Sequence, residues 1–212
     1  MMPNTYLTLN HSFFAVRVMG YRMVPVQFDL RVSCVPVAHS DLTHSAAGHR
    51  AAVTYQLIKC WMEEMLSNAT LADPTTELGE QLSCVCDSHV LFTPGAPDDF
   101  VLVRLIHSKC AAIARDRVQI LSAALSSSDT DHSERVWTGT EYGLPGIEYA
   151  GCPTVHSVPW WQRPTIDVWD HCVREGEQPA DHSDPLEILE SELSRHWQAC
   201  EPAEIIDNIW KS

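Results

Sequence analysis

Four cysteine and histidine side chains in this chain could form a metal site. Cys84 and Cys86 are separated by one residue, so an extended backbone would point both thiols to the same side. His107 and Cys110 are three residues apart, which places them on one face of a helix. Thiolate and imidazole groups are zinc ligands, and four of them complete its tetrahedral shell. The spacing therefore permits a zinc site, but the competing hypothesis is that these side chains pack in the core.

Motifs of the common catalytic classes are missing from the sequence. It contains no nucleophile elbow, no phosphate-binding loop, no dinucleotide-binding glycine motif and no His-Glu-x-x-His. The carboxylate pairs Asp167/Asp170 and Glu175/Glu177 could perform acid–base chemistry on a sugar beside neighbouring tryptophans. Acidic side chains in such an acidic segment are more often solvated surface. We therefore favour a protein that is not an enzyme, predict no cofactor and assign no catalytic residue.

The tryptophans are concentrated in one part of the chain. Six of the seven lie in residues 131–212, which also carry 16 acidic and 5 basic residues, a net charge of −11. Because tryptophan buries a large area at little conformational cost, it is enriched at binding hot spots. The sequence thus predicts a protein contact in this segment, and the alternative is that the rings fill the core of a loop-rich region. The candidate contact residues are Trp160, Trp161, Trp169, Leu189, Leu193 and Trp197.

Length and charge exclude several other classes of protein. A chain of 212 residues fits one domain, or one domain with an appendage. The formal net charge of −14 disfavours direct binding to nucleic acid or to an anionic membrane, because both require concentrated Lys and Arg. No apolar run reaches the roughly 18 residues of a membrane-spanning helix. The N-terminus lacks the basic region of a secretory signal, so we expect a cytoplasmic protein with eight reduced cysteines.

The first 38 residues have the pattern of β-strands. Apolar Val24, Val26 and Phe28 alternate with polar neighbours, which is typical of a half-buried strand. A break at Gly20-Tyr21 separates this run from an earlier one, so we expect an antiparallel hairpin or a three-stranded meander. Pro25 cannot donate to a ladder, so its end of the strand should lie at a sheet edge.

Two core helices are expected to follow. The first should begin near Thr43 or Ser45 and run to about Ser67. The second should begin after an Asp98 cap and continue to about Ala124, because apolar residues fall on one side of a helical wheel over that length. Between them we expect a loop over 68–80 and a strand over 81–92.

The C-terminal part is expected to hold loops and then helices. Short strands are possible over 154–158 and 165–169. A helix should follow the cap at Ser183 or Asp184, with Leu186, Leu189 and Leu193 in its apolar stripe, and a short helix should start at Pro202.

These elements together predict an α+β fold. It comprises an N-terminal antiparallel sheet with two core helices, a loop-rich region and acidic C-terminal helices. We expect an α+β core domain over 1–130, a loop-rich Trp-containing region over 131–180 and an acidic helical segment over 181–212.

For function, we favour a non-enzymatic protein-binding or assembly subunit, such as a virion or complex component or a protein inhibitor. It should bind a protein partner or associate with itself, without direct contact to nucleic acid or membrane. The alternatives are a zinc-dependent enzyme, or an acidic mimic of nucleic acid that occupies a basic groove.

Overall fold

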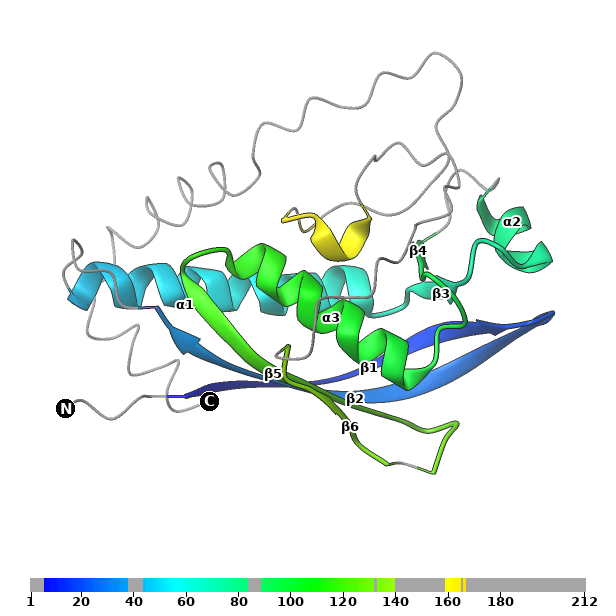
Figure 1. Cartoon of the computed structure of the whole chain (residues 1–212), viewed down its shortest axis with the longest axis horizontal. Helices are drawn as coiled ribbons and strands as arrows, with labels where there is room; N and C mark the ends of the chain where they lie inside the picture. The colour runs from blue at the N-terminus through cyan, green and yellow to red at the C-terminus, as the bar shows by residue number, and fades with distance from the viewer. Residues whose placement is uncertain are drawn as a thin grey trace, which may run out of the picture. The chain divides into compact units, whose positions relative to one another are not determined.

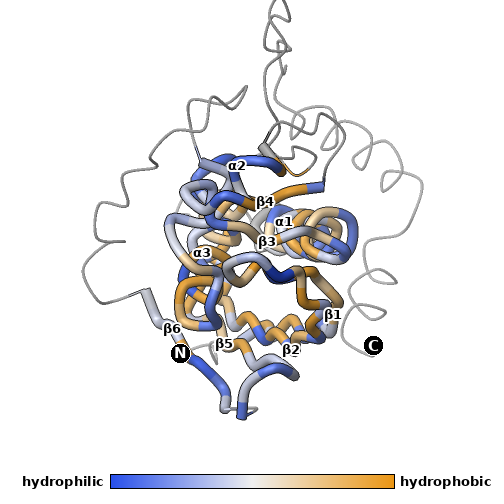
Figure 2. The backbone as a smooth tube through the Cα atoms, turned by 90° about the vertical axis from the view of Figure 1, so that its right-hand side faces the viewer, coloured by the Kyte–Doolittle hydropathy of each residue, from blue (hydrophilic) through white to orange (hydrophobic). Residues whose placement is uncertain are grey.

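The computed structural model describes residues 6–37, 44–83, 89–131, 133–139, 159–164 and 166, all within the unit Met1–Pro179. They form a six-stranded mixed sheet in the order β4-β3-β1-β2-β5-β6, together with several helices (Figure 1). Helices α1 and α3 contact each other and lie side by side over one face of β1, β2 and β5 (Figure 2). This architecture confirms the predicted α+β class. The elements are β1 Leu7–Met19, β2 Arg22–Pro36, α1 His44–Trp61, η1 Met62–Leu66, β3 Thr70–Ala72, α2 Glu77–Ser83, β4 Val90–Phe92, α3 Asp99–Ala114, β5 Val118–Ser127, β6 Arg135–Trp137 and η2 Trp160–Gln162.

The long hairpin β1–β2 forms the two central strands of the sheet. Its register pairs Phe13 with Phe28 and Ala15 with Val26, and all four of these side chains are buried. The strictly alternating burial along β2 follows from the period of two in the sequence. Of the two expected arrangements, the hairpin is the correct one, because all of Leu7–Met19 forms one continuous strand, β1.

Among the described strands, none pairs with β2 at Pro25 on the side away from β1. Pairing of β2 with β5 begins only at Phe28, so the hairpin end beyond that point is an edge on this side. The amide of Gln27, two residues further on, points outward to the Ser128 hydroxyl at 3.1 Å. The backbone of Pro25 has the same orientation as that of Gln27, so an N–H at position 25 would also point away from β1. The lack of this N–H therefore costs no hydrogen bond between β1 and β2 and only removes a donor from the free edge. The predicted edge position is therefore confirmed.

The second core helix ends earlier than predicted. Asp98 caps α3 as expected, accepting a hydrogen bond from the Val101 amide at 2.8 Å. The helix stops at Ala114, where Arg115 adopts a φ of +50°. The predicted helical stretch up to Ala124 is wrong, because residues Val118–Ser127 form β5, antiparallel to β2. Consecutive residues of this inner strand are buried, so its apolar positions do not alternate and they match a helical wheel by chance.

The segment between the two core helices also differs from the prediction. The expected loop over 68–80 contains β3 and the start of α2, and residues 81–83 of the expected strand belong to α2. Among the described residues of that predicted strand, Val90–Phe92 form a strand, β4, which pairs in parallel with β3. Leu78 and Leu82 of α2 pack against a small buried cluster. The members of this cluster are Val18, Ala72, Val90 and Phe92.

The other predictions have mixed outcomes. The expected helix over 43–67 is present as α1 and its continuation η1. The predicted strands over 154–158 and 165–169 and the predicted C-terminal helices fall on, or almost entirely on, residues outside those described.

Candidate interaction surface

Exposed apolar side chains gather at the turn end of the β1–β2 hairpin. Seven large hydrophobic side chains are exposed in the described part of the chain; three of them flank this turn, and Phe14 lies further back, in the middle of β1. Their exposed fractions are 61% for Phe14, 54% for Met19, 81% for Tyr21 and 49% for Met23. We call these four residues the hairpin surface. Single exposed hydrophobic residues need no explanation, but several on one element indicate a contact site.

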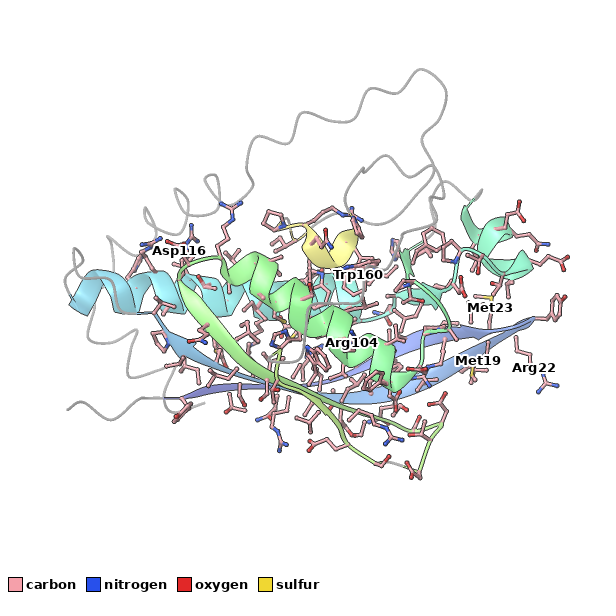
Figure 3. All side chains as sticks on the ribbon, viewed as in Figure 1. Met19, Arg22, Met23, Arg104, Asp116 and Trp160 are labelled. Carbon is pink, nitrogen blue, oxygen red and sulfur yellow. The ribbon has the colours of Figure 1, made fainter. Side chains whose placement is uncertain are left out.

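A tight turn holds the hairpin surface in place. Met19 pairs with Arg22, so Gly20 and Tyr21 form a two-residue loop. Gly20 has a φ of +60°, the conformation that a type II′ turn requires at its first central position and that glycine adopts without strain. Met23 instead pairs with Val18, so Met19 and Met23 project from opposite sides of the hairpin (Figure 3). The turn thus displays apolar side chains in several directions from a narrow tip.

The charge of this end differs from that of the whole chain. The sequence from Tyr6 to Phe28 contains no Asp or Glu, although the chain carries a net charge of −14. Its two basic residues are Arg17 and Arg22. Arg17 is buried and paired with carboxylates, whereas Arg22 is exposed beside the turn. Within the part of the chain that the structure describes, the hairpin end is therefore apolar with one exposed positive charge, that of Arg22.

Buried ion pairs anchor the hairpin just below its tip. The Arg17 guanidinium donates to Asp99 at the start of α3 and to both carboxylate oxygens of Asp129, at 2.9 and 3.1 Å. It also lies over the Phe28 ring, 5.0 Å from the centroid. The Ser127 hydroxyl donates to Asp99 at 2.6 Å. These contacts join β1, α3 and the end of β5 two residues before Met19.

Sequence analysis missed both the hairpin surface and this ion-pair network. The signal for the surface is the apolar character of Met19, Tyr21 and Met23 around a tight turn, where polar residues are the rule. The network has no comparable local signal. Arg17 is separated from Asp99 by 82 positions and from Asp129 by 112, so the sequence alone does not show that they meet.

Of the four candidate zinc ligands, the structure describes only His107 and Cys110, both on α3. The thiol of Cys110 is completely buried, and the half-buried His107 ring lies against Gly139. Burial lowers the pKa of His107. Cys84 and Cys86 lie outside the described residues. Within the described ranges, no three His, Cys, Asp or Glu side chains are grouped as metal ligands, and the zinc site stays a prediction.

Two of the candidate contact tryptophans lie in the core. Trp160 and Trp161 are buried and meet edge to face, with ring centroids 5.6 Å apart. Trp160 stacks on Trp61 of α1 and donates its indole N–H to the Phe92 carbonyl at 2.7 Å. The core-filling alternative therefore describes these two rings, since the fold uses their area internally. The remaining candidates lie outside the described residues, namely Trp169, Leu189, Leu193 and Trp197.

The proposed sugar-cleaving carboxylates have no described position. Asp167, Asp170, Glu175 and Glu177 all lie outside the described residues, so the structure does not test them.

Two comparisons of the sequence with known proteins found no match. No family model matches the chain, and no curated protein matches it significantly. Among the described helices, none is long and apolar enough to cross a bilayer.

The buried thiols should be nearly inert toward alkylating reagents. Burial raises the pKa of Cys110 to about 12 and that of Cys34 to about 11. Because the thiolate is the nucleophile, alkylation of both at pH 8 should be on the order of 100-fold slower in the folded chain than in urea. Iodoacetamide labelling followed by peptide mapping measures both rates, and half-buried Cys60 is the internal control. Equal labelling of Cys60 and Cys110 in the folded chain would show that Cys110 is accessible.

Proposed function

We propose that this chain is a non-enzymatic protein-binding or assembly subunit and that the hairpin surface contacts its partner. The observation that carries the proposal is the exposure of Met19, Tyr21 and Met23 around the turn of a long hairpin, with Phe14 exposed further along β1. Exposing these side chains to water is unfavourable, at roughly 25 cal/mol for each Å² of apolar area. A partner that covers them removes this cost.

The residue types suit such a contact. Tyrosine presents a rigid, amphipathic ring and is enriched at binding hot spots. Methionine is flexible and polarizable, which lets it fill an irregular partner surface. The ion pairs of Arg17 fix the hairpin just below its tip. Binding of the tip to a partner therefore costs little conformational entropy of the backbone.

The contact should use side chains rather than an added β-strand. A peptide could extend the sheet only along an edge with free amides, and Pro25 removes one such amide at the hairpin's open edge. We infer that the partner presents an apolar pocket or groove to the tip.

Substitutions in the hairpin surface should weaken partner binding without affecting the fold. We expect the double variant Tyr21→Ser/Met23→Ser to lose at least about tenfold in affinity, because hot-spot residues contribute roughly 2 kcal/mol or more. The partner is first captured through a photo-crosslinking residue at position 21, and its affinity for the purified chain is then measured by calorimetry. Tyr6→Ser is the matched control, since Tyr6 is 62% exposed on the same hairpin but precedes β1 at its far end. Equal losses in the two variants, or none in either, would contradict the proposal.

The acidic C-terminal segment provides a second, independent test of partner binding. Its apolar stripe of Leu186, Leu189, Leu193 and Trp197 must be covered by this chain or by a partner. From the sequence, which places Gly176 and Pro179 between residues 174 and 184, we expect a hinge before this stripe, and therefore a chain truncated after Ala180 that folds and loses its partner or its self-association. Circular dichroism and sedimentation velocity of the truncated chain measure both properties. A truncated chain that does not fold would place the stripe in the domain's own core.

A further inference from the structure

Two thioether groups lie exposed on the hairpin surface, whereas two others lie in the core. Met19 and Met23 are 54% and 49% exposed. Met62 and Met65, both in η1, are 1% and 5% exposed. Thioether sulfur is oxidised to the sulfoxide by peroxides, and oxidation depends on access of the oxidant to the sulfur atom. The four described methionines therefore divide into an accessible pair and a protected pair.

We propose that Met19 and Met23 form an oxidation site, and that peroxide converts the hairpin surface from apolar to polar. The consequence for a partner rests on the function proposed above, whereas the oxidation itself does not. The reagent class is a two-electron peroxide oxidant such as hydrogen peroxide. Enzymes that reduce methionine sulfoxide make the change reversible.

The reaction at each sulfur is a single oxygen transfer. A lone pair of the thioether attacks one peroxide oxygen, the O–O bond breaks and an S–O bond forms. The departing oxygen takes up the proton of the transferred oxygen and leaves as water. The sulfur loses two electrons, and the two peroxide oxygens gain one each, one in the sulfoxide and the other in water. Each event replaces an apolar sulfur with a polar, hydrogen-bond-accepting sulfoxide.

The position of the two residues confines this change to the surface. They project from opposite sides of the hairpin, so double oxidation makes both sides of the tip polar (Figure 3). Val18, which pairs with Met23, is the neighbour that belongs to the buried cluster with Ala72 and Phe92. Neither Met19 nor Met23 is a member of that cluster, so oxidation at position 19 or 23 places no sulfoxide among its four side chains. Oxidation of Met62 or Met65 would instead put a polar group into the core.

Peptide mapping tests the selectivity of the reaction in the folded, full-length chain. Trypsin cleaves after Arg17, Arg22 and Arg31, so Met19 and Met23 fall in two separate short peptides. Met62 and Met65 fall together in another peptide, which serves as the internal control. With dilute hydrogen peroxide, we expect Met19 and Met23 to oxidise on the order of tenfold faster than the η1 pair. Similar rates for all four, or faster oxidation in η1, would overturn the proposal.

Hydrophobic-interaction chromatography tests the change in surface character. The oxidised chain should elute earlier than the untreated chain, with an unchanged melting temperature. The variant Met19→Leu/Met23→Leu keeps the apolar surface without a thioether, and its elution should not change on peroxide treatment. Unchanged elution of the oxidised wild-type chain would overturn the proposal. Both measurements use the chain alone, so their failure is distinct from a failure of the hairpin substitutions to weaken partner binding.

Discussion

Replacing Arg17 by methionine is expected to lower the free energy of unfolding by about 3–5 kcal/mol, because Asp99 and Asp129 lose their buried counter-ion. Asp99 is itself buried at the start of α3, so its carboxylate cannot recover full hydration. Methionine retains much of the apolar length of arginine, and the effect therefore reports mainly the lost charge. Urea denaturation followed by circular dichroism measures the change.

Arg31→Met is the matched control for this experiment. Arg31 lies on the adjacent strand β2 and pairs with Glu134 at 2.8 Å, but the two side chains are 52% and 46% exposed. An exposed ion pair contributes little, so this variant should change stability by less than about 1 kcal/mol. A further variant, Arg17→Met/Asp99→Asn/Asp129→Asn, should recover part of the loss by removing the uncompensated charges. Equal effects of Arg17→Met and Arg31→Met would mean that the Arg17 network is not buried in solution.

Ile113→Asp is expected to prevent stable folding, at a cost of roughly 4 kcal/mol or more. Ile113 has no exposed surface and lies in the last turn of α3, on the face that packs against the sheet. A carboxylate at this position would be buried without a designed partner. Because this variant is expected not to accumulate as folded protein, Ile113→Ala supplies a measurable value, with an expected loss of about 2–5 kcal/mol.

Arg115→Asp provides the control two residues away. Arg115 is exposed, and its φ of +50° and ψ of −123° lie outside the left-handed helical region, so the backbone strain at this position is similar for Arg and Asp. We therefore expect this variant to change stability by no more than about 0.5 kcal/mol. Thermal unfolding of Ile113→Ala and Arg115→Asp gives the comparison directly. Similar stabilities for the two variants would contradict the buried face assigned to α3.

The Arg17 ion pairs lie on the same hairpin as the proposed contact residues. Arg17 anchors β1 two residues before Met19, so the network that stabilises the fold also supports the hairpin surface. Arg17→Met should consequently weaken partner binding and also lower the free energy of unfolding. Tyr21→Ser/Met23→Ser should weaken binding alone, because neither side chain belongs to the core. The two kinds of variant thus separate the support of the surface from its contact residues.

Several elements of this fold were predictable because their causes are local. The alternation from Val24 to Val32 and the Gly20-Tyr21 break predict the hairpin, since register and turn lie within adjacent residues. The Asp98 cap predicts the start of α3 because it bonds to the amide three residues later. Pro25 marks a free edge for the equally local reason that its own N–H is missing.

The sequence by itself determined the hairpin, helix α1, the start of α3 and the α+β class, all of which depend on residue patterns within short windows. Only the tertiary structure decided that residues 118–127 form a strand, because β5 exists through pairing with β2 and β6. The burial of Trp160 and Trp161 depends in the same way on distant partners, Trp61 and Phe92. The hairpin surface required both levels: local residues place Met19, Tyr21 and Met23 at a turn, but their exposure follows from what the rest of the chain leaves uncovered. Local patterns encode backbone preference, whereas pairing and burial depend on residues far apart in the sequence.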